Sequence, residues 1–232
     1  MSEETTNIQP STPSSMTLIL TLGIIAMVSG LLVVLTDQLT KDRIARLEKE
    51  ALERAITSVL PEAVTSQSYQ LNEDGLLLLE DGQSADAEKN TLYAGYDANG
   101  KLSGLAMISS ARGYAGIVKV LYGYNPESQC VIGFTVLQST ETPGLGDKIE
   151  KDPNFLANFE CLDASLSEDG SKIANVIETV KNGNKDNPWQ IDGISGATVT
   201  SKALGTGLGE STSRMLPLLN KYRDSLPLQL EQ

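Results

Sequence analysis

Residues 192–201 read DGISGATVTS, and this stretch decides how the C-terminal part of the chain folds. Asp192 and Ser195 are residue types that cap helix N-termini, and an apolar-periodic segment, Val199 to Leu219, follows them. The sequence therefore predicts a helix over 199–219. It contains glycines at three alternate positions, Gly205, Gly207 and Gly209. This pattern indicates either a surface for close packing or a weakened helix.

The start of the predicted helix is also a candidate anion site. Gly196 and Ala197 are small, so backbone N–H groups there can approach a ligand closely. A helix N-terminus offers unpaired N–H groups at the positive end of the helix dipole, which suits a phosphate. Side chains would add four donors: Thr198, Thr200, Ser201 and Lys202. On local chemistry alone, an ordinary capped helix after a glycine turn is the alternative.

Composition excludes several classes of function. The 232-residue chain contains no histidine, which excludes a Ser-His-Asp triad and a histidine-ligated zinc or haem site. Its two cysteines cannot hold an iron–sulfur cluster within one chain. Electron transfer would therefore need an organic cofactor, and no catalytic residue or metal site is predicted. A net charge of −12 argues against nucleic acid as a partner, because lysine and arginine bind its phosphates.

Cys130 and Cys161 lie far apart in the sequence and outside any CxxC spacing. They are compatible with a disulfide on an oxidising side of a membrane, or with two buried free thiols. The sequence does not distinguish these two states.

Residues 16–36 are predicted to form a transmembrane helix. Met16 to Leu35 contains no charged residue, and at ~1.5 Å per residue it covers the ~30 Å hydrocarbon core. A cleaved signal peptide is disfavoured, because the apolar run is long and the residues before it hold Glu3 and Glu4 but no lysine or arginine. Residues 1–15 are rich in serine, threonine, proline and glutamate, which predicts a disordered tail.

Residues 37–60 are predicted to form a helical stalk that Pro61 ends. Apolar residues recur at helical spacing and are expected to lay one stripe on the following domain: Leu39, Ile44, Leu47, Ala51, Leu52, Ile56 and Val59. Lys41, Arg43 and Arg46 follow the membrane segment. Taken alone, the positive-inside rule would place the domain in the cytoplasm.

A globular domain is predicted over residues 61–222, followed by a C-terminal tail over 223–232. Asn99-Gly100 is a strong hairpin signal between two apolar runs. Strands are expected at 76–79, 91–97, 101–109, 116–124, 130–137 and 173–180, and a further helix at 147–159. Strands that precede helices indicate an α+β fold behind the single N-terminal transmembrane helix.

Three motifs of this domain resemble the FMN-carrying proteins of two membrane complexes. These are the G component of the Rnf complex (RnfG) and the C component of the sodium-pumping NADH:quinone reductase. Residues 192–198 are similar to Asp-x-x-Ser-Gly-Ala-Thr, the motif to which a flavin transferase attaches FMN. Residues 141–146, ETPGLG, and 112–120, RGYAGIVKV, resemble two further motifs. The motifs follow the family order, and the resemblance covers most of residues 16–220.

The resemblance implies an FMN site in which Thr198 carries the flavin through a phosphoester bond. Other implied cofactor contacts lie in the same stretch and in the 141–146 loop: Asp192, Ser195, Gly196, Ala197, Thr200, Ser201, Glu141, Thr142, Gly144 and Leu145. A purely structural turn is the alternative for this loop, since Pro143-Gly144 favours a tight turn. Tyr114 is expected either to face the flavin or to lie in a core strand.

The resemblance also implies a function. The chain would be an electron-carrying subunit of an Rnf-type complex, which passes electrons between reduced ferredoxin and NAD+ and couples this to sodium or proton movement. Its partners would be other membrane and redox subunits and the flavin transferase, and it would hold no complete active site of its own. The domain would lie on the extracytoplasmic face of the cytoplasmic (inner) membrane, against the orientation that Lys41, Arg43 and Arg46 favour.

Three alternatives remain open at this point. Within the same class, the chain would be the C component of the NADH:quinone reductase. A second class is a stand-alone, membrane-anchored FMN electron carrier or flavin-based sensor. A third is a membrane-anchored scaffold without redox chemistry.

Overall fold

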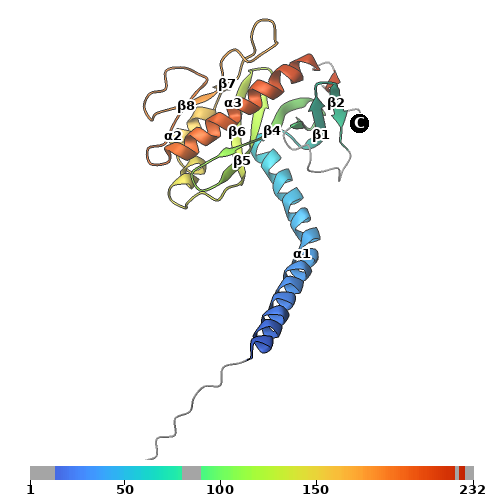
Figure 1. Cartoon of the computed structure of the whole chain (residues 1–232). Helices are drawn as coiled ribbons and strands as arrows, with labels where there is room; N and C mark the ends of the chain where they lie inside the picture. Colours follow the sequence, from blue (N-terminus) through green and yellow to red (C-terminus); the bar gives the residue numbers. More distant parts are fainter. Residues whose placement is uncertain (1–13, 80–89, 223–224, 228–232) are drawn as a thin grey trace, which may run out of the picture. The chain divides into compact units, whose positions relative to one another are not determined.

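The N-terminal helix α1, Ser15–Val59, joins the predicted transmembrane helix and stalk into one element (Figure 1). A computed structural model describes residues 14–79, 90–222 and 225–227. The helix is long and apolar enough to cross a membrane. The chain divides into two compact units, Met1–Glu50 and Ala51–Gln232. The tails predicted over 1–15 and 223–232 lie largely outside the described residues.

The second unit is built on a seven-stranded antiparallel sheet with the strand order β2-β1-β3-β4-β5-β6-β7. The strands are β1 Thr65–Asn72, β2 Gly75–Leu78, β3 Thr91–Tyr96, β4 Leu102–Arg112, β5 Ile117–Asn125, β6 Cys130–Gln138 and β7 Leu162–Asp163. The five strands predicted between 76 and 137 are confirmed. β1 was not predicted because its sequence, TSQSYQLN, buries only Tyr69 and Leu71. β7 was not predicted because it is two residues long.

The sheet has a packed core on each face, as β4 shows. Leu105 and Met107 belong to the larger core, and the alternate residues Ala106 and Ile108 belong to a smaller one. Helix α3, Thr198–Lys221, covers the larger core. The C-terminal turns of α1 supply Ala55, Ile56 and Val59 to the smaller core, so the end of the predicted stalk stripe packs on the sheet.

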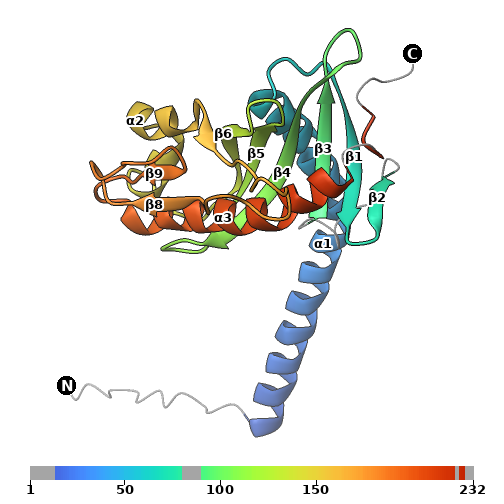
Figure 2. The same cartoon turned by 90° about the horizontal axis from the view of Figure 1, so that it is seen from above.

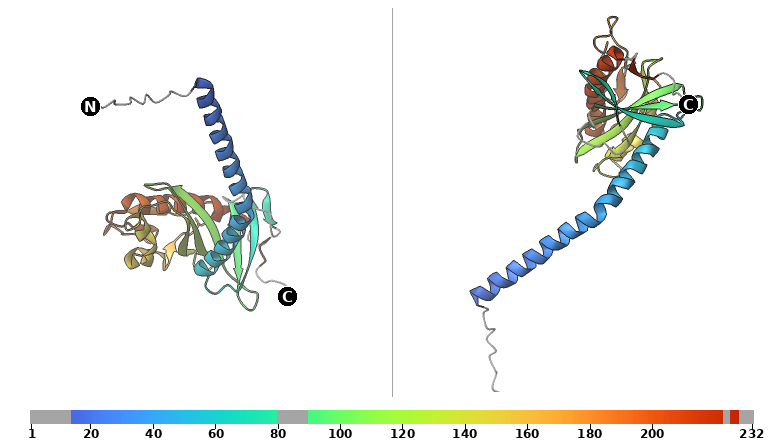
Figure 3. Two further views of the ribbon diagram at one scale, coloured as in Figure 1. Left: turned by 90° about the horizontal axis from the view of Figure 1, so that it is seen from below. Right: turned by 90° about the vertical axis from the view of Figure 1, so that its right-hand side faces the viewer.

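Helix α3, Thr198–Lys221, lies between this sheet and a small parallel sheet of β8, Glu178–Val180, and β9, Gln190–Asp192. Figure 2 shows α3 crossing the strands with β8 and β9 beside it, and the views of Figure 3 agree. The glycines permit this close packing. A Cβ on Gly207 would lie 2.6 Å from Ser109 Oγ on β4, and one on Gly209 would lie 2.5 Å from the carbonyl oxygen of Ile177. The helix is not interrupted.

Two predicted elements are wrong in extent. Residues 147–159 form three short pieces instead of one helix: η2 Gly146–Glu150, α2 Pro153–Leu156 and η3 Ala157–Phe159. The break occurs because Pro153 has no N–H, and because Asp152 Oδ1 caps a new helix by accepting from the N–H groups of Asn154 (2.9 Å) and Phe155 (3.3 Å). Of the predicted strand 173–180, only β8 is formed, together with a single bridge between Ile173 and Leu166.

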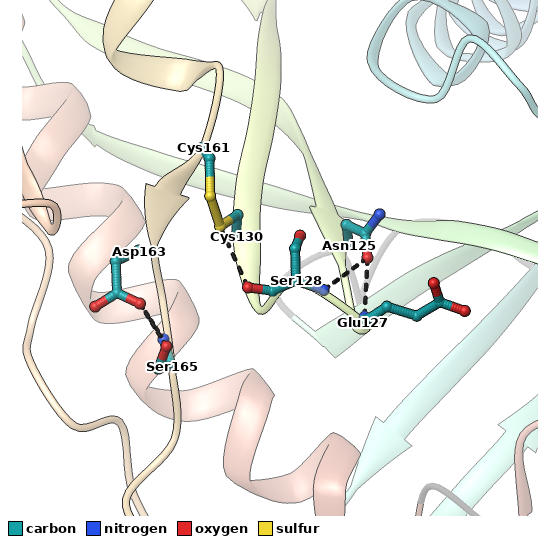
Figure 4. Close-up of a disulfide and its surroundings, with 7 residues drawn as sticks. All are labelled: Asn125, Glu127, Ser128, Cys130, Cys161, Asp163 and Ser165. Atoms are coloured by element: carbon teal, nitrogen blue, oxygen red, sulfur yellow. Dashed lines mark hydrogen bonds between the residues drawn. A yellow bond between two sulfur atoms is a disulfide. The ribbon is translucent and has the colours of Figure 1, made fainter.

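Cys130 and Cys161 are joined in a disulfide (Figure 4). The bond links the start of β6 to the residue before β7. Of the two states that the sequence left open, the structure therefore has the disulfide. The segment that it closes contains the whole ETPGLG loop and the short helices that follow it.

We expect Gly209→Ala to destabilise the protein by about 1–3 kcal/mol, because the added methyl group overlaps the Ile177 carbonyl. In an unconstrained helix the same change stabilises by about 1 kcal/mol, so the predicted sign is opposite to helix propensity. Chemical denaturation of the full-length protein in detergent measures the difference. Thr206→Ala, at an exposed position of the same helix, is the control. Equal or greater stability of Gly209→Ala would contradict the packing described here.

Candidate functional site

The first half of the 192–201 stretch is fixed by hydrogen bonds. The N–H of Gly193 donates to the carbonyl of Val180 on β8 (3.1 Å). The N–H of Ile194 donates to Ser201 Oγ (3.2 Å), and the Ser201 hydroxyl donates to the carbonyl of Ala197 (2.9 Å). Ser201 is buried, and its side chain closes the turn from inside.

The exposed residues of the stretch lie in its middle. Ser195, Gly196 and Thr198 all face solvent, whereas Ala197 is buried and anchors the turn. Gly196 has a φ of +84°, a left-handed conformation that glycine adopts without steric cost. Thr198, at the first position of α3, is therefore an exposed residue on a turn of defined shape, and its hydroxyl donates to the carbonyl of Ile194 (3.5 Å).

The N-terminus of α3 is not capped as the sequence predicted. Ala197 occupies the N-cap position and makes no side-chain hydrogen bond. Asp192 lies at the end of β9, where its carboxylate accepts from the N–H of Gly183 (2.7 Å). Ser195 is exposed in the turn before the helix. Both predicted caps are wrong because the helix begins three residues after Ser195.

The backbone donors at this helix start are available. Within the described part of the chain, no group accepts a hydrogen bond from the N–H of Thr198, Val199 or Thr200. Lys202 is exposed one helical turn after Thr198, on the same side of α3. Free N–H groups, a helix dipole and an ammonium group together fit a phosphate group bound at Thr198.

The Glu141 carboxylate joins three separate segments. Its Oε2 accepts from the hydroxyl of Thr200 in the first turn of α3 (2.5 Å). Its Oε1 accepts from the N–H of Ala115, in the turn between β4 and β5 (2.8 Å). All three motifs singled out in the sequence therefore meet at this carboxylate. Thr200 is buried, so its hydroxyl faces the protein.

Glu141 is held in its ionised form. Partial burial raises the pKa of the Glu141 carboxyl group, but the Thr200 hydroxyl and the backbone N–H groups of Ala115, Gly116 and Tyr114 outweigh this effect. The pKa therefore lies below its usual value. The site is anchored by a negative charge that is hydrogen-bonded from two neighbouring segments.

Glycines make room for this carboxylate. A Cβ on Gly113 would lie 2.6 Å from Glu141 Oε1, and one on Gly146 would lie 2.5 Å from Glu141 Cβ. Gly113 and Gly146 therefore let the backbone approach the Glu141 side chain closely. Thr142, Gly144 and Leu145, the other candidate contacts of this loop, are all exposed.

Large apolar side chains are exposed on the segments that Glu141 joins. Tyr114 is 78% exposed, Leu145 is 50% exposed and Val199 is 49% exposed. Tyr114 is thus not part of a core strand, which excludes that reading of the sequence. These side chains offer apolar surface that a planar aromatic ring could cover.

Two side chains that hydrogen-bond to the candidate site had no signal in the sequence. Asn182 donates from Nδ2 to the carbonyl of Gly193 (2.9 Å), and Asn158 bonds to the backbone of Asp192. They belong to a polar loop and to η3, and no spacing relates either residue to the stretch that it holds.

A groove of about 440 Å³ runs beside α3 and β8. Its described lining includes Lys202, Thr206 and Glu178 but neither Thr198 nor Glu141. Lys202 thus lies in the lining of this groove, one helical turn after Thr198.

Comparisons with known proteins agree with this geometry. A family of FMN-binding domains matches residues 113–211, which include the three segments that meet at Glu141. A second family, the RnfG N-terminal region, matches residues 20–59.

Curated relatives span most of the chain. The G component of the ion-translocating oxidoreductase complex of Vibrio vulnificus is 31% identical over 193 residues, covering 80% of this chain and 82% of the relative. The G component of the Na(+)-translocating ferredoxin:NAD(+) oxidoreductase complex of Acetobacterium woodii is 28% identical, covering 83% of this chain and 87% of the relative.

A solved structure shares the fold. The C component of the Na(+)-translocating NADH-quinone reductase from Parabacteroides distasonis aligns with a TM-score of 0.57 at 22% identity, covering 82% of this chain and 98% of that one. The likeness confirms a fold of mixed helix and sheet behind an N-terminal helix.

We expect Glu141→Gln to lower the free energy of unfolding at pH 7 by about 1 kcal/mol, because the charge-assisted hydrogen bonds are weakened. The pKa of Glu141 is depressed in the folded state, so its contribution is present above the unfolded pKa and is lost as pH falls through the folded pKa. The difference from wild type should therefore shrink between pH 7 and about pH 3. Denaturation at several pH values measures it, with the exposed Glu160→Gln as control. A pH-independent difference would show that the charge of Glu141 plays no part.

Proposed function

We infer the function from one premise: the chain belongs to the RnfG family of the ion-translocating oxidoreductase complexes. We propose that it is the FMN-carrying electron-transfer subunit of an Rnf-type membrane complex. That complex would pass electrons between reduced ferredoxin and NAD+ and couple the transfer to sodium or proton translocation. The name of the Acetobacterium woodii relative supports this reaction class.

The observation that carries the proposal is Thr198, an exposed residue whose hydroxyl stands at an uncapped helix start. We propose that the FMN phosphate is esterified to this hydroxyl. The free N–H groups of Val199 and Thr200 and the ammonium group of Lys202 would then hold the phosphate oxygens. Bound FMN supplies reversible uptake and release of electrons, chemistry that no side chain in this sequence provides.

Other residues would serve the site in two ways. On the exposed side, Thr142, Gly144 and Leu145 would contact the flavin. The flavin transferase would recognise the stretch from Asp192 to Ala197, in which Ser195 and Gly196 are accessible. Three residues would fix the geometry of the site, because their side chains are hydrogen-bonded within the protein: Glu141, Thr200 and Ser201.

A covalent bond suits the charge of this protein. A net charge of −12 disfavours holding a free anionic nucleotide by general electrostatic attraction. An ester bond to Thr198 would retain the flavin in every oxidation state. The redox partners, which would be other subunits of the complex, would then always meet the cofactor at the same place.

We propose that the domain lies on the extracytoplasmic face, anchored by a single transmembrane helix over 16–36 with a stalk over 37–60. The Cys130–Cys161 disulfide supports this side, because disulfides form and persist in oxidising compartments. The opposing signal from Lys41, Arg43 and Arg46 is diluted by acidic residues of the same segment: Asp37, Asp42, Glu48 and Glu50.

The C component of the NADH:quinone reductase is the less favoured alternative. The likeness to the Parabacteroides distasonis structure, at 22% identity, concerns the fold alone. The N-terminal match is to the RnfG region, and identity to the relatives from Rnf-type complexes reaches 31%. These findings favour the RnfG assignment.

When the protein is produced together with the flavin transferase, we expect flavin fluorescence that survives denaturing electrophoresis and is lost in Thr198→Ala. Thr206→Ala, a threonine two turns further along α3, should keep the fluorescence. Mass spectrometry of the peptide that contains Thr198 should find one FMN esterified there. Fluorescence that persists in Thr198→Ala would place the attachment elsewhere, and a colourless wild type would favour a scaffold.

We expect protease added to spheroplasts to digest the domain, because it would face outward. Without reductant, Cys130 and Cys161 should resist a maleimide reagent after denaturation and react once reduced. Cys130→Ser should leave Cys161 reactive without reduction, which is the control. Full protection from protease would place the domain in the cytoplasm.

A further inference from the structure

Asn158 is a buried residue whose side-chain amide uses all of its hydrogen-bonding capacity. It lies in η3 and is 5% exposed. Its nitrogen donates to the carbonyls of Phe155 (2.9 Å) and Asp192 (3.3 Å). Its oxygen accepts from the N–H of Asp192 (3.0 Å) and from the ammonium group of Lys185 (3.0 Å). An amide offers two donors and two acceptor sites, and each has a partner here.

The two hydrogen bonds between the Asn158 side chain and the backbone of Asp192 resemble those that a neighbouring β-strand would make. On one edge, β9 pairs with β8, and Val180 lies opposite Asp192. On its other edge, the N–H and the carbonyl of Asp192 both bond to Asn158, as they would to a strand. Asp192 is therefore held from both edges at the point where β9 ends and the attachment stretch begins.

The backbone that follows Asp192 is also fixed by hydrogen bonds. Gly193 is bonded through its N–H to Val180 and through its carbonyl to Asn182. Between Ile194 and Ala197 only Ser195 and Gly196 are exposed, and the N–H of Ala197 closes the turn by donating to the carbonyl of Ile194 (3.1 Å). The exposed turn is thus held at both ends, and Asp192 fixes the end from which the chain enters it.

We propose that Asn158 is a positioning residue for flavin attachment: it fixes the backbone of Asp192 and thereby sets where the Thr198 hydroxyl is presented. The inference rests on the function proposed for Thr198. Asn158 acts through Asp192 and does not touch the exposed residues of the stretch. Its removal leaves the N–H and carbonyl of Asp192 without partners at a partly buried position, which is unfavourable.

The test compares full-length wild type, Asn158→Ala and Asn154→Ala. Asn154 is exposed in the neighbouring helix α2 and is the matched control. Backbone hydrogen exchange is measured on protein made without the transferase. Flavin per folded protein is measured after production with it. In Asn158→Ala we expect exchange at residues 192–194 to become about tenfold faster and flavin incorporation to fall several-fold. Exchange in β4 to β6 should be unchanged, and Asn154→Ala should match wild type.

Asn158→Asp provides a second, milder variant. It keeps oxygen acceptors for the Asp192 N–H and for Lys185 but loses both amide donors, so we expect intermediate values. If Asn158→Ala does not fold, the same hydrogen-exchange and flavin measurements on Asn158→Asp test the proposal. Unchanged flavin incorporation in a folded variant would overturn the proposal, and so would equally faster exchange in β4 to β6. A wild type without flavin would instead remove the proposed function, while the exchange data would still decide whether Asn158 fixes Asp192.

Discussion

The close approach of α3 to two layers of strands is the constraint on which the structure depends. Gly207 lets the helix lie against β4, and Gly205 and Gly209 let it lie against β8 and the segment before it. With larger side chains the helix would have to move away from one layer. The helix carries Thr198 at its first position, so the packing of its middle determines where its start is placed. The candidate site residue at the start of α3 is thus positioned by contacts that lie about two to three helical turns further along the helix.

Two polar side chains then complete the site from outside α3. Glu141 bonds to Thr200 and to the turn at Ala115, and Asn158 bonds to Asp192. Both residues connect segments that are far apart in the sequence. Asn158 has a partner for each of its donor and acceptor sites, and both oxygens of Glu141 accept hydrogen bonds from the protein. The exposed Thr198 and the backbone donors of the helix start are left for a ligand.

Local signals allowed much of the fold to be predicted, and they singled out Thr198 as the candidate site residue. The hairpin at Asn99-Gly100, the helix after Thr198 and the flavin motif are each encoded within a few neighbouring residues. What was missed depends on tertiary contacts. β1 has little apolar pattern because it buries two side chains, the helix cap at Ser195 was displaced by the turn at Gly196, and Asn158 is recognisable only once Asp192 is beside it. The resemblance supplied the cofactor, which the residue pattern alone left as an anion site.

The division of the 192–201 stretch into a fixed base and an exposed tip bears on the order of events in biogenesis. Ala197 is buried while the neighbouring Thr198 is exposed, so the enzyme proposed to attach FMN would reach its acceptor without unfolding the domain. Under the proposed function, export, closure of the disulfide and packing of the core would all be able to precede loading of the cofactor. Only chains that have folded correctly would then present Thr198 in the shape that this enzyme reads.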